Sequence, residues 1–224
     1  MLVSVVIGGF ILSFRKWGIG GTVNLNFGFY NLVISALILA VNLFIAISII
    51  KLYGLKIGHK VQYSFGKFST MISLFVAFLG DGWIPFISPG TFKCTLMTNI
   101  RHGRIRPGLQ LKDLATLSLL GAISSLIIAF IAKLILLSTP GNYVIERIMF
   151  ISVIFAIVSM LPFPEFNGFH VFFCSRMLYI FTFISILAIG IFFLILGIVL
   201  SLILALLIGF IAWILYYLLY ESKL

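Results

Sequence analysis

The sequence predicts an all-α polytopic membrane protein with about six transmembrane helices, at roughly 20 apolar residues for each span. Of the 224 residues, 62% are hydrophobic and only 9% are charged, and the mean hydropathy is +1.28. Soluble domains carry about 25% charged residues. The apolar residues form continuous runs, whereas a membrane β-barrel would alternate residue by residue. Soluble enzymes, disordered proteins and fibrous repeats are therefore excluded.

The charge balance is strongly basic, with 15 Lys and Arg residues against 5 Asp and Glu residues. In a membrane protein this excess indicates cytoplasmic loops that follow the positive-inside rule. We expect no nucleic-acid partner, because the basic residues are not interleaved with exposed aromatic residues in a soluble module. The two cysteines, Cys94 and Cys174, are too few and too separated to predict a disulfide framework or a zinc ribbon.

The N-terminal half contains one clear span and two weaker apolar runs. Met1–Phe14 is about 21 Å long as a helix, so we expect a short or partly interfacial helix in an N-terminal segment of residues 1–28. Phe29–Leu52 is long enough to cross a bilayer. Met71–Pro89 carries Asp81 and is interrupted by several glycines and prolines.

The C-terminal half is more uniformly apolar. Leu114–Leu137 and Val144–Leu161 each predict a span. Met177–Tyr220 holds 44 almost uncharged residues, which would make one helix of about 66 Å. We therefore expect two helices that meet near Gly190, Gly197 or Ser201. Residues 29–176 then form the membrane core, and residues 177–224 form a helical hairpin.

The topology depends on the interrupted run Met71–Pro89. Nine of the fifteen basic residues surround it: Lys51, Lys56, Lys60, Lys67, Lys93, Arg101, Arg104, Arg106 and Lys112. If this run enters the membrane and returns, all nine lie on the cytoplasmic face, as the positive-inside rule favours. Interrupted backbone at membrane depth is tolerated where protein covers it. We therefore expect a re-entrant element, although Arg15 and Lys16 then lie on the opposite face.

A second interruption follows the span Val144–Leu161, in the sequence Leu-Pro-Phe-Pro-Glu-Phe-Asn-Gly that ends at Gly168. Pro162 and Pro164 break a helix and favour extended backbone. Unwound helices within membranes often contact ions or substrates. The alternative interpretation is a plain helix terminator at the interface.

This segment resembles the Leu-Pro-x-Pro-x-x-Asp-Gly motif of site-2 proteases, which are zinc-dependent intramembrane metalloproteases, and Asn167 stands at the aspartate position. The resemblance covers about residues 29–171. Tyr53-Gly54-Leu55-Lys56 resembles the aromatic-Gly-x-Lys stretch that follows the family's His-Glu-x-x-His motif. Counting back by the family spacing places the two histidine positions at Asn42 and Ala46 and the glutamate position at Leu43. Residues 88–90 and 119–125 resemble the re-entrant region and the Ala-Gly-Pro-x-x-Asn helix of archaeal-type members.

The residues at the zinc-ligand and catalytic-base positions of this motif differ from those that a zinc peptidase needs. A zinc peptidase needs three protein ligands, an open coordination position and a carboxylate base. Asn42 and Asn167 offer neutral amides, while Ala46 and Leu43 offer no ligand and no base. We therefore expect no catalytic residues, no cofactor and no zinc at these positions, in a protease-like fold without protease activity.

Two further groups of residues are weaker candidates. His170 and Cys174 are four residues apart and would share a helix face, so that with Glu165 they could form a relocated metal site. Asp81 could be a polar site at membrane depth, or it could simply favour the turn Gly80-Asp81-Gly82.

The interpretation that these patterns favour is a catalytically inactive relative of site-2 proteases that acts as a binding or assembly subunit of a hetero-oligomeric membrane complex. Its candidate binding groove lies between the re-entrant element and the unwound segment, with Pro162, Pro164, Asn167, Gly168 and Asp81 as candidate binding residues. Its other partner is the lipid bilayer, and the archaeal-type resemblance implies a multi-pass protein of a prokaryotic plasma membrane. The alternatives are an active metalloprotease with non-standard ligands and a small transporter or channel subunit.

Overall fold

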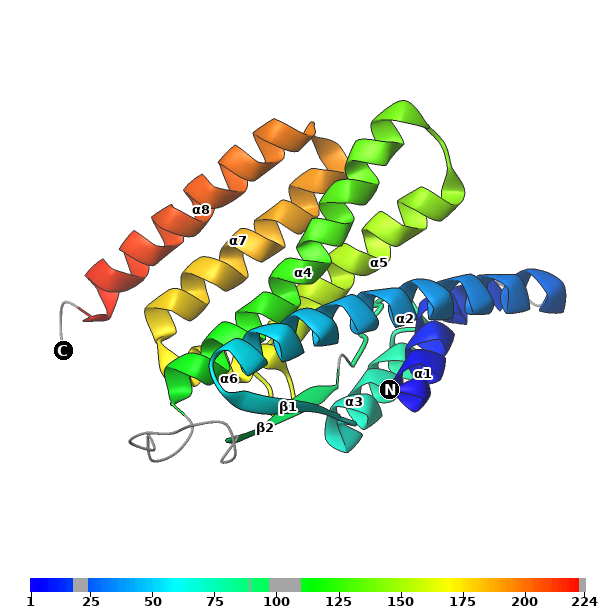
Figure 1. The fold of residues 1–224 in the computed structure, drawn as a ribbon. Helices are drawn as coiled ribbons and strands as arrows, with labels where there is room; N and C mark the ends of the chain where they lie inside the picture. Colours follow the sequence, from blue (N-terminus) through cyan, green and yellow to red (C-terminus); the bar gives the residue numbers. More distant parts are fainter. Residues whose placement is uncertain (18–23, 89, 97–109, 222–224) are drawn as a thin grey trace.

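The computed structural model describes residues 1–17, 24–88, 90–96 and 110–221. Figure 1 shows these residues as a bundle of helices with one two-stranded sheet at its edge. The helices are α1 (Leu2–Ser13), the 3-10 helix η1 (Phe14–Trp17), α2 (Leu25–Lys56), α3 (Lys67–Leu79), α4 (Leu111–Ser138), α5 (Tyr143–Ser159), α6 (Asn167–Cys174), α7 (Arg176–Ile195) and α8 (Ile198–Leu219). The strands are β1 (His59–Ser64) and β2 (Thr91–Leu96).

Four of the described helices are long and apolar enough to cross a membrane: α2, α4, α7 and α8. This confirms the coarse prediction of a helical membrane protein, but not the expected six spans. The fifth apolar run forms α5, which has 17 residues. The first and third runs form α1 and α3, which are shorter still, with 12 and 13 residues.

The long C-terminal apolar run divides into α7 and α8 at Leu196 and Gly197, both of which have extended backbone. Gly197 is one of the three expected break positions, whereas Gly190 and Ser201 lie within helices. The Ser201 hydroxyl donates hydrogen bonds to the carbonyls of Phe192 (3.1 Å) and Gly197 (2.7 Å). Both carbonyls also accept a backbone hydrogen bond, from the N–H of Leu196 and of Ser201 respectively, so the Ser201 hydroxyl adds a second donor that links the end of α7 to the start of α8.

The sheet is an addition to the predicted all-α fold. β1 and β2 pair antiparallel, with His59 opposite Leu96 and Ser64 opposite Thr91. Because β1 precedes α3 and β2 follows it, the pairing returns the chain to the edge from which α3 departs. Six of the nine basic residues lie on or beside these elements at this end of the bundle: Lys51, Lys56, Lys60, Lys67, Lys93 and Lys112. The other three, Arg101, Arg104 and Arg106, lie outside the described residues.

Small residues allow the helices to approach closely. A side chain at Gly9 of α1 would meet Ala36 of α2 at 2.7 Å, and one at Gly190 of α7 would meet Ile157 of α5 at 2.7 Å. Gly209 of α8 lies directly against Ser185 of α7. Close approach through small residues is typical of helix packing in membranes, where the hydrophobic effect does not drive helices together.

Candidate functional site

The four positions that the motif resemblance identifies are all buried. Asn42, Leu43 and Ala46 lie in the middle of α2 and expose 1%, 2% and 4% of their surface, while Asn167 begins α6 and exposes 7%. Leu43, Ala46 and Asn167 line a single cavity of about 30 Å³. Residues far apart in the sequence are thus brought to one place.

The walls of this cavity are mainly apolar. Besides those three residues it is lined by Ile47, Ile50, Tyr63, Gly90, Thr91, Phe92 and Phe155. Tyr63 and Phe92 are a cross-strand pair of the sheet, so an element that the sequence did not predict closes one side. The volume suffices for a water molecule, but not for a metal ion together with a peptide substrate.

Asn42 does not line the cavity but links α2 to α5. Its Nδ2 donates hydrogen bonds to the carbonyl of Ile38 (3.3 Å) and to Oγ of Ser152 on α5 (2.9 Å). Its buried Oδ1 has no hydrogen-bond partner among the described residues. Asn42 therefore joins α2 to α5 through a side-chain hydrogen bond.

The proline-rich segment interrupts the helix as predicted. α5 ends at Ser159 and α6 begins at Asn167, and the intervening residues form turns in which Pro162 and Pro164 are exposed. Gly168 lies so close to the turn that a side chain there would overlap the carbonyl of Met160 and approach the carbonyl oxygen of Leu161 to 2.7 Å. A glycine is therefore required where α6 turns back against the end of α5.

Asn167 packs closely against α4. A side chain at Gly121 of α4 would lie 3.0 Å from Nδ2 of Asn167, so the absence of a side chain at Gly121 makes room for the amide. No hydrogen bond of the Asn167 side chain occurs within the described part of the chain. Asn167 therefore packs against α4 and lines the cavity.

Glu165 connects the proline-rich segment to α3. Its backbone has a positive φ of 70°, and its Oε2 accepts a hydrogen bond of 2.8 Å from the backbone N–H of Ser69. That N–H belongs to the first turn of α3, where helical partners are missing, and the N-cap residue Gly66 has no side chain to supply one. Glu165 thus caps α3 from a distant part of the chain.

The relocated metal site is not assembled among the described residues. No group of three His, Cys, Asp or Glu side chains able to hold a metal ion occurs in the part of the chain that the structure describes. His170 and Cys174 do lie on α6, one turn apart. The His170 ring packs against Phe92 and Phe169 at centroid distances of 5.6 and 5.9 Å, and burial lowers the pKa of this imidazole. Glu165 meanwhile binds Ser69.

Asp81 lies at the C-terminal end of α3 and is exposed. Its φ is 50°, its N–H bonds to the carbonyl of Phe78, and the N–H of Gly82 bonds to the carbonyl of Ala77. This is the Schellman arrangement that ends many helices, in which the residue after the cap adopts left-handed backbone. The geometry agrees with the turn interpretation, and Asp81 does not line the 30 Å³ cavity.

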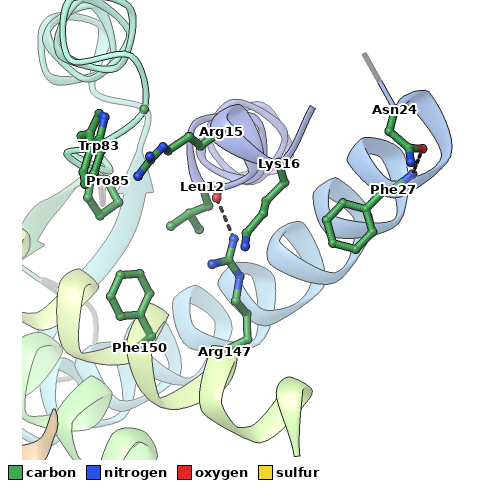
Figure 2. A pocket seen from close by; sticks show the side chains of 10 residues that line it. Leu12, Arg15, Lys16, Asn24, Phe27, Trp83, Pro85, Arg147 and Phe150 are labelled. Carbon is green, nitrogen blue, oxygen red and sulfur yellow. Dashed lines mark hydrogen bonds between the residues drawn. The ribbon is translucent and has the colours of Figure 1, made fainter. Parts of the chain in front are cut away.

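A second, larger pocket of about 560 Å³ lies near the N-terminal end of α2 (Figure 2). Three basic side chains line it: Arg15 and Lys16 from η1, and Arg147 from α5. In the sequence, Arg15 and Lys16 stand out only as an exception to the positive-inside rule. The signal that could have revealed the pocket is the coincidence of this exception with Arg147, a basic residue near the start of the span on the same face.

Comparison of the chain with protein-family models, with curated proteins and with solved structures finds no match.

Proposed function

We propose that this protein is a non-catalytic membrane subunit with a core like that of site-2 proteases, and that it works by binding other membrane proteins. The observation that carries the proposal is the 30 Å³ cavity, where Leu43, Ala46 and Asn167 meet. Three of the four positions that would hold zinc and the catalytic base converge there without a metal ligand or a base among them.

The donor set does not fit a zinc ion. Structural and catalytic zinc sites use thiolate, imidazole and carboxylate ligands. The cavity offers one amide from Asn167 and one hydroxyl each from Tyr63 and Thr91, within apolar walls. Hydrolysis also needs a base for the attacking water, and Leu43 cannot accept a proton. These residues therefore support no hydrolytic step.

A binding role is supported by the apolar surface of the outermost helix. α8 packs mainly against α7, and only 17% of its most apolar window is buried. Its exposed side includes large side chains along its whole length: Val199, Leu200, Ile203, Leu206, Leu207, Phe210 and Ile211. Such a face can accommodate lipid or the apolar helix of a partner, and a subunit of a hetero-oligomer would use it for the latter.

The finer topology belongs to the same proposal. We infer that α3 and residues 80–88 form a re-entrant element in a multi-pass protein of a prokaryotic plasma membrane. In support, the pairing of β1 with β2 returns the chain to its starting edge. Cysteines introduced at Lys60 and Lys112, in a background without Cys94 and Cys174, should react with an impermeant reagent from the same side. Labelling from opposite sides would contradict the re-entrant path.

Photocrosslinking in the native membrane tests the binding role. A photoreactive phenylalanine analogue at Phe210, which is 51% exposed, should crosslink to another membrane protein. The matched control is the same analogue at Phe193 of α7, which is 1% exposed and should react only within the chain. Adducts with lipid alone at Phe210, or stoichiometric zinc in the purified protein, would contradict the proposed function.

A further inference from the structure

The pocket near the start of α2 concentrates positive charge from two separate segments. Arg15 and Lys16 of η1 and Arg147 of α5 all line it, and all three are partly buried. No Asp or Glu is among its described lining residues. Asn24, the N-cap of the 32-residue helix α2, also lines it, and a helix N-terminus adds further positive potential.

Two of the three basic side chains are held in place by the protein. The guanidinium carbon of Arg15 lies 3.4 Å from the centroid of the Trp83 ring, a cation–π arrangement. Nη2 of Arg147 donates a hydrogen bond of 2.7 Å to the carbonyl of Leu12 at the end of α1. A guanidinium has five N–H donors in a planar fork, so each arginine keeps donors for a ligand. Figure 2 shows Lys16 with its amine turned toward the same space.

Within the described part of the chain, no salt bridge joins any of these three side chains to a carboxylate. Charged groups that are partly withdrawn from water are normally paired. Arginine forks match the geometry of phosphate oxygens, and basic pockets between membrane helices are suited to lipid headgroups. An anion with several acceptor oxygens would therefore complete the site.

The remaining walls are apolar and point to an amphiphilic ligand. Leu12, Phe27 and Phe150 line the same pocket, while Trp83 on its rim is 67% exposed, as is typical of aromatic residues at a membrane interface. We propose that this pocket binds a phosphate ester, as carried by the headgroup of an anionic phospholipid, with Arg15, Lys16 and Arg147 on the phosphate and Phe27 and Phe150 beside the hydrocarbon. This site is independent of the proposed binding function.

Binding of phosphatidylglycerol to the full chain in neutral detergent, measured by native mass spectrometry, tests the proposal. Lys16→Gln is the primary variant, because the Lys16 side chain makes no hydrogen bond among the described residues and its loss should leave the fold intact. The double variant Arg15→Gln/Lys16→Gln removes two of the three charges. Lys51→Gln and Lys51→Gln/Lys56→Gln are the matched controls, because they remove the same charge from the other end of α2. Melting temperatures check that each variant is folded.

We expect Lys16→Gln to weaken phosphatidylglycerol binding by about tenfold, the effect of losing one charge-assisted hydrogen bond, and the double variant to weaken it further. The Lys51 controls should bind like the parent, and phosphatidylcholine should bind more weakly than phosphatidylglycerol. Equal losses in the pocket and control variants, or no loss in either, would overturn the proposal. Competition by inorganic phosphate at similar concentration would identify a free phosphate as the ligand, whereas no competition would identify the lipid.

Discussion

The small cavity at Asn167 and the basic pocket near Asn24 both lie along α2 but differ in size and polarity. The cavity at Leu43, Ala46 and Asn167 is about 30 Å³, is lined mainly by apolar side chains and is closed by the sheet. The pocket at the first turn of α2 is about 560 Å³ and is lined by three cations. Motif resemblance points to the first cavity, yet the groups that can bind a ligand lie in the second.

The tight turn at Gly168, next to the cavity residue Asn167, gives the largest expected effect. Gly168→Ala should destabilise the protein by more than about 3 kcal/mol, because the new methyl group would overlap the Met160 carbonyl and backbone cannot easily move away. Gly197→Ala is the control, since no atom lies within 4 Å of the point that its new methyl group would occupy. Thermal unfolding in detergent measures both. Equal melting temperatures for the two variants would show that the turn is not tightly packed.

Asn167→Asp tests whether the small cavity can bind a metal ion. The carboxylate would be buried with no hydrogen-bond donor supplied by the described residues, so a loss of about 1–3 kcal/mol is expected. Unfolding with and without added zinc measures this loss. A variant as stable as the parent, or one that zinc stabilises, would show that the site suits a metal ion and would contradict the contrast between the two cavities.

The surroundings of His170, which packs against the cavity residue Phe92, predict a pH dependence. Burial lowers the pKa of His170 below its ordinary value of 6.5, so below that pH the unfolded chain binds a proton that the folded chain refuses. The contribution of His170 to stability is therefore complete above pH 6.5 and decreases as the pH falls. Melting temperatures of the parent and His170→Gln should diverge less at low pH than at high pH. Parallel pH profiles would indicate that this side of the cavity is well hydrated.

The smallest expected stability effect belongs to the basic pocket. Lys16→Gln should change the free energy of unfolding by no more than about 0.5 kcal/mol, as for a surface substitution, or should stabilise the protein slightly by relieving repulsion from Arg15 and Arg147. Phosphatidylglycerol, however, should stabilise this variant less than it stabilises the parent, because the variant binds the lipid more weakly. If Lys16 instead served only to pack the protein, Lys16→Gln would lower the stability in the absence of lipid and would leave the stabilisation by phosphatidylglycerol unchanged.

The long apolar helices could be predicted from the sequence, because about twenty consecutive apolar residues have few other stable arrangements. The division at Gly197 is one of three expected positions, and the break at Pro162 and Pro164 follows from proline chemistry. The sheet could not be predicted in the same way. Its two strands are short and separated by α3, and each carries a lysine, Lys60 or Lys93, that is more readily interpreted as part of a charged loop.

The resemblance to site-2 proteases singles out Leu43, Ala46 and Asn167. These three residues line one cavity, but the protease-like character of that site stays a prediction. The neighbouring prolines predict that the Asn167 amide bonds to free backbone groups, but the described residues give it no such bond. The cap of α3 by Glu165 and the meeting of Lys16 with Arg147 join residues far apart in the chain, so only the folded arrangement reveals them.

Arg147 and Lys133 have a consequence for the order of assembly. Arg147 binds the carbonyl of Leu12 at the end of α1, and the Lys133 amine donates a hydrogen bond of 2.7 Å to the carbonyl of Phe193 near the end of α7. Both donors come from the central pair α4 and α5. During synthesis α1 therefore emerges before Arg147 exists, whereas Lys133 is made before α7. α1 can pack against α2 as soon as α2 is made, through Gly9 and Ala36, but the bond at its end forms only after α5 has followed.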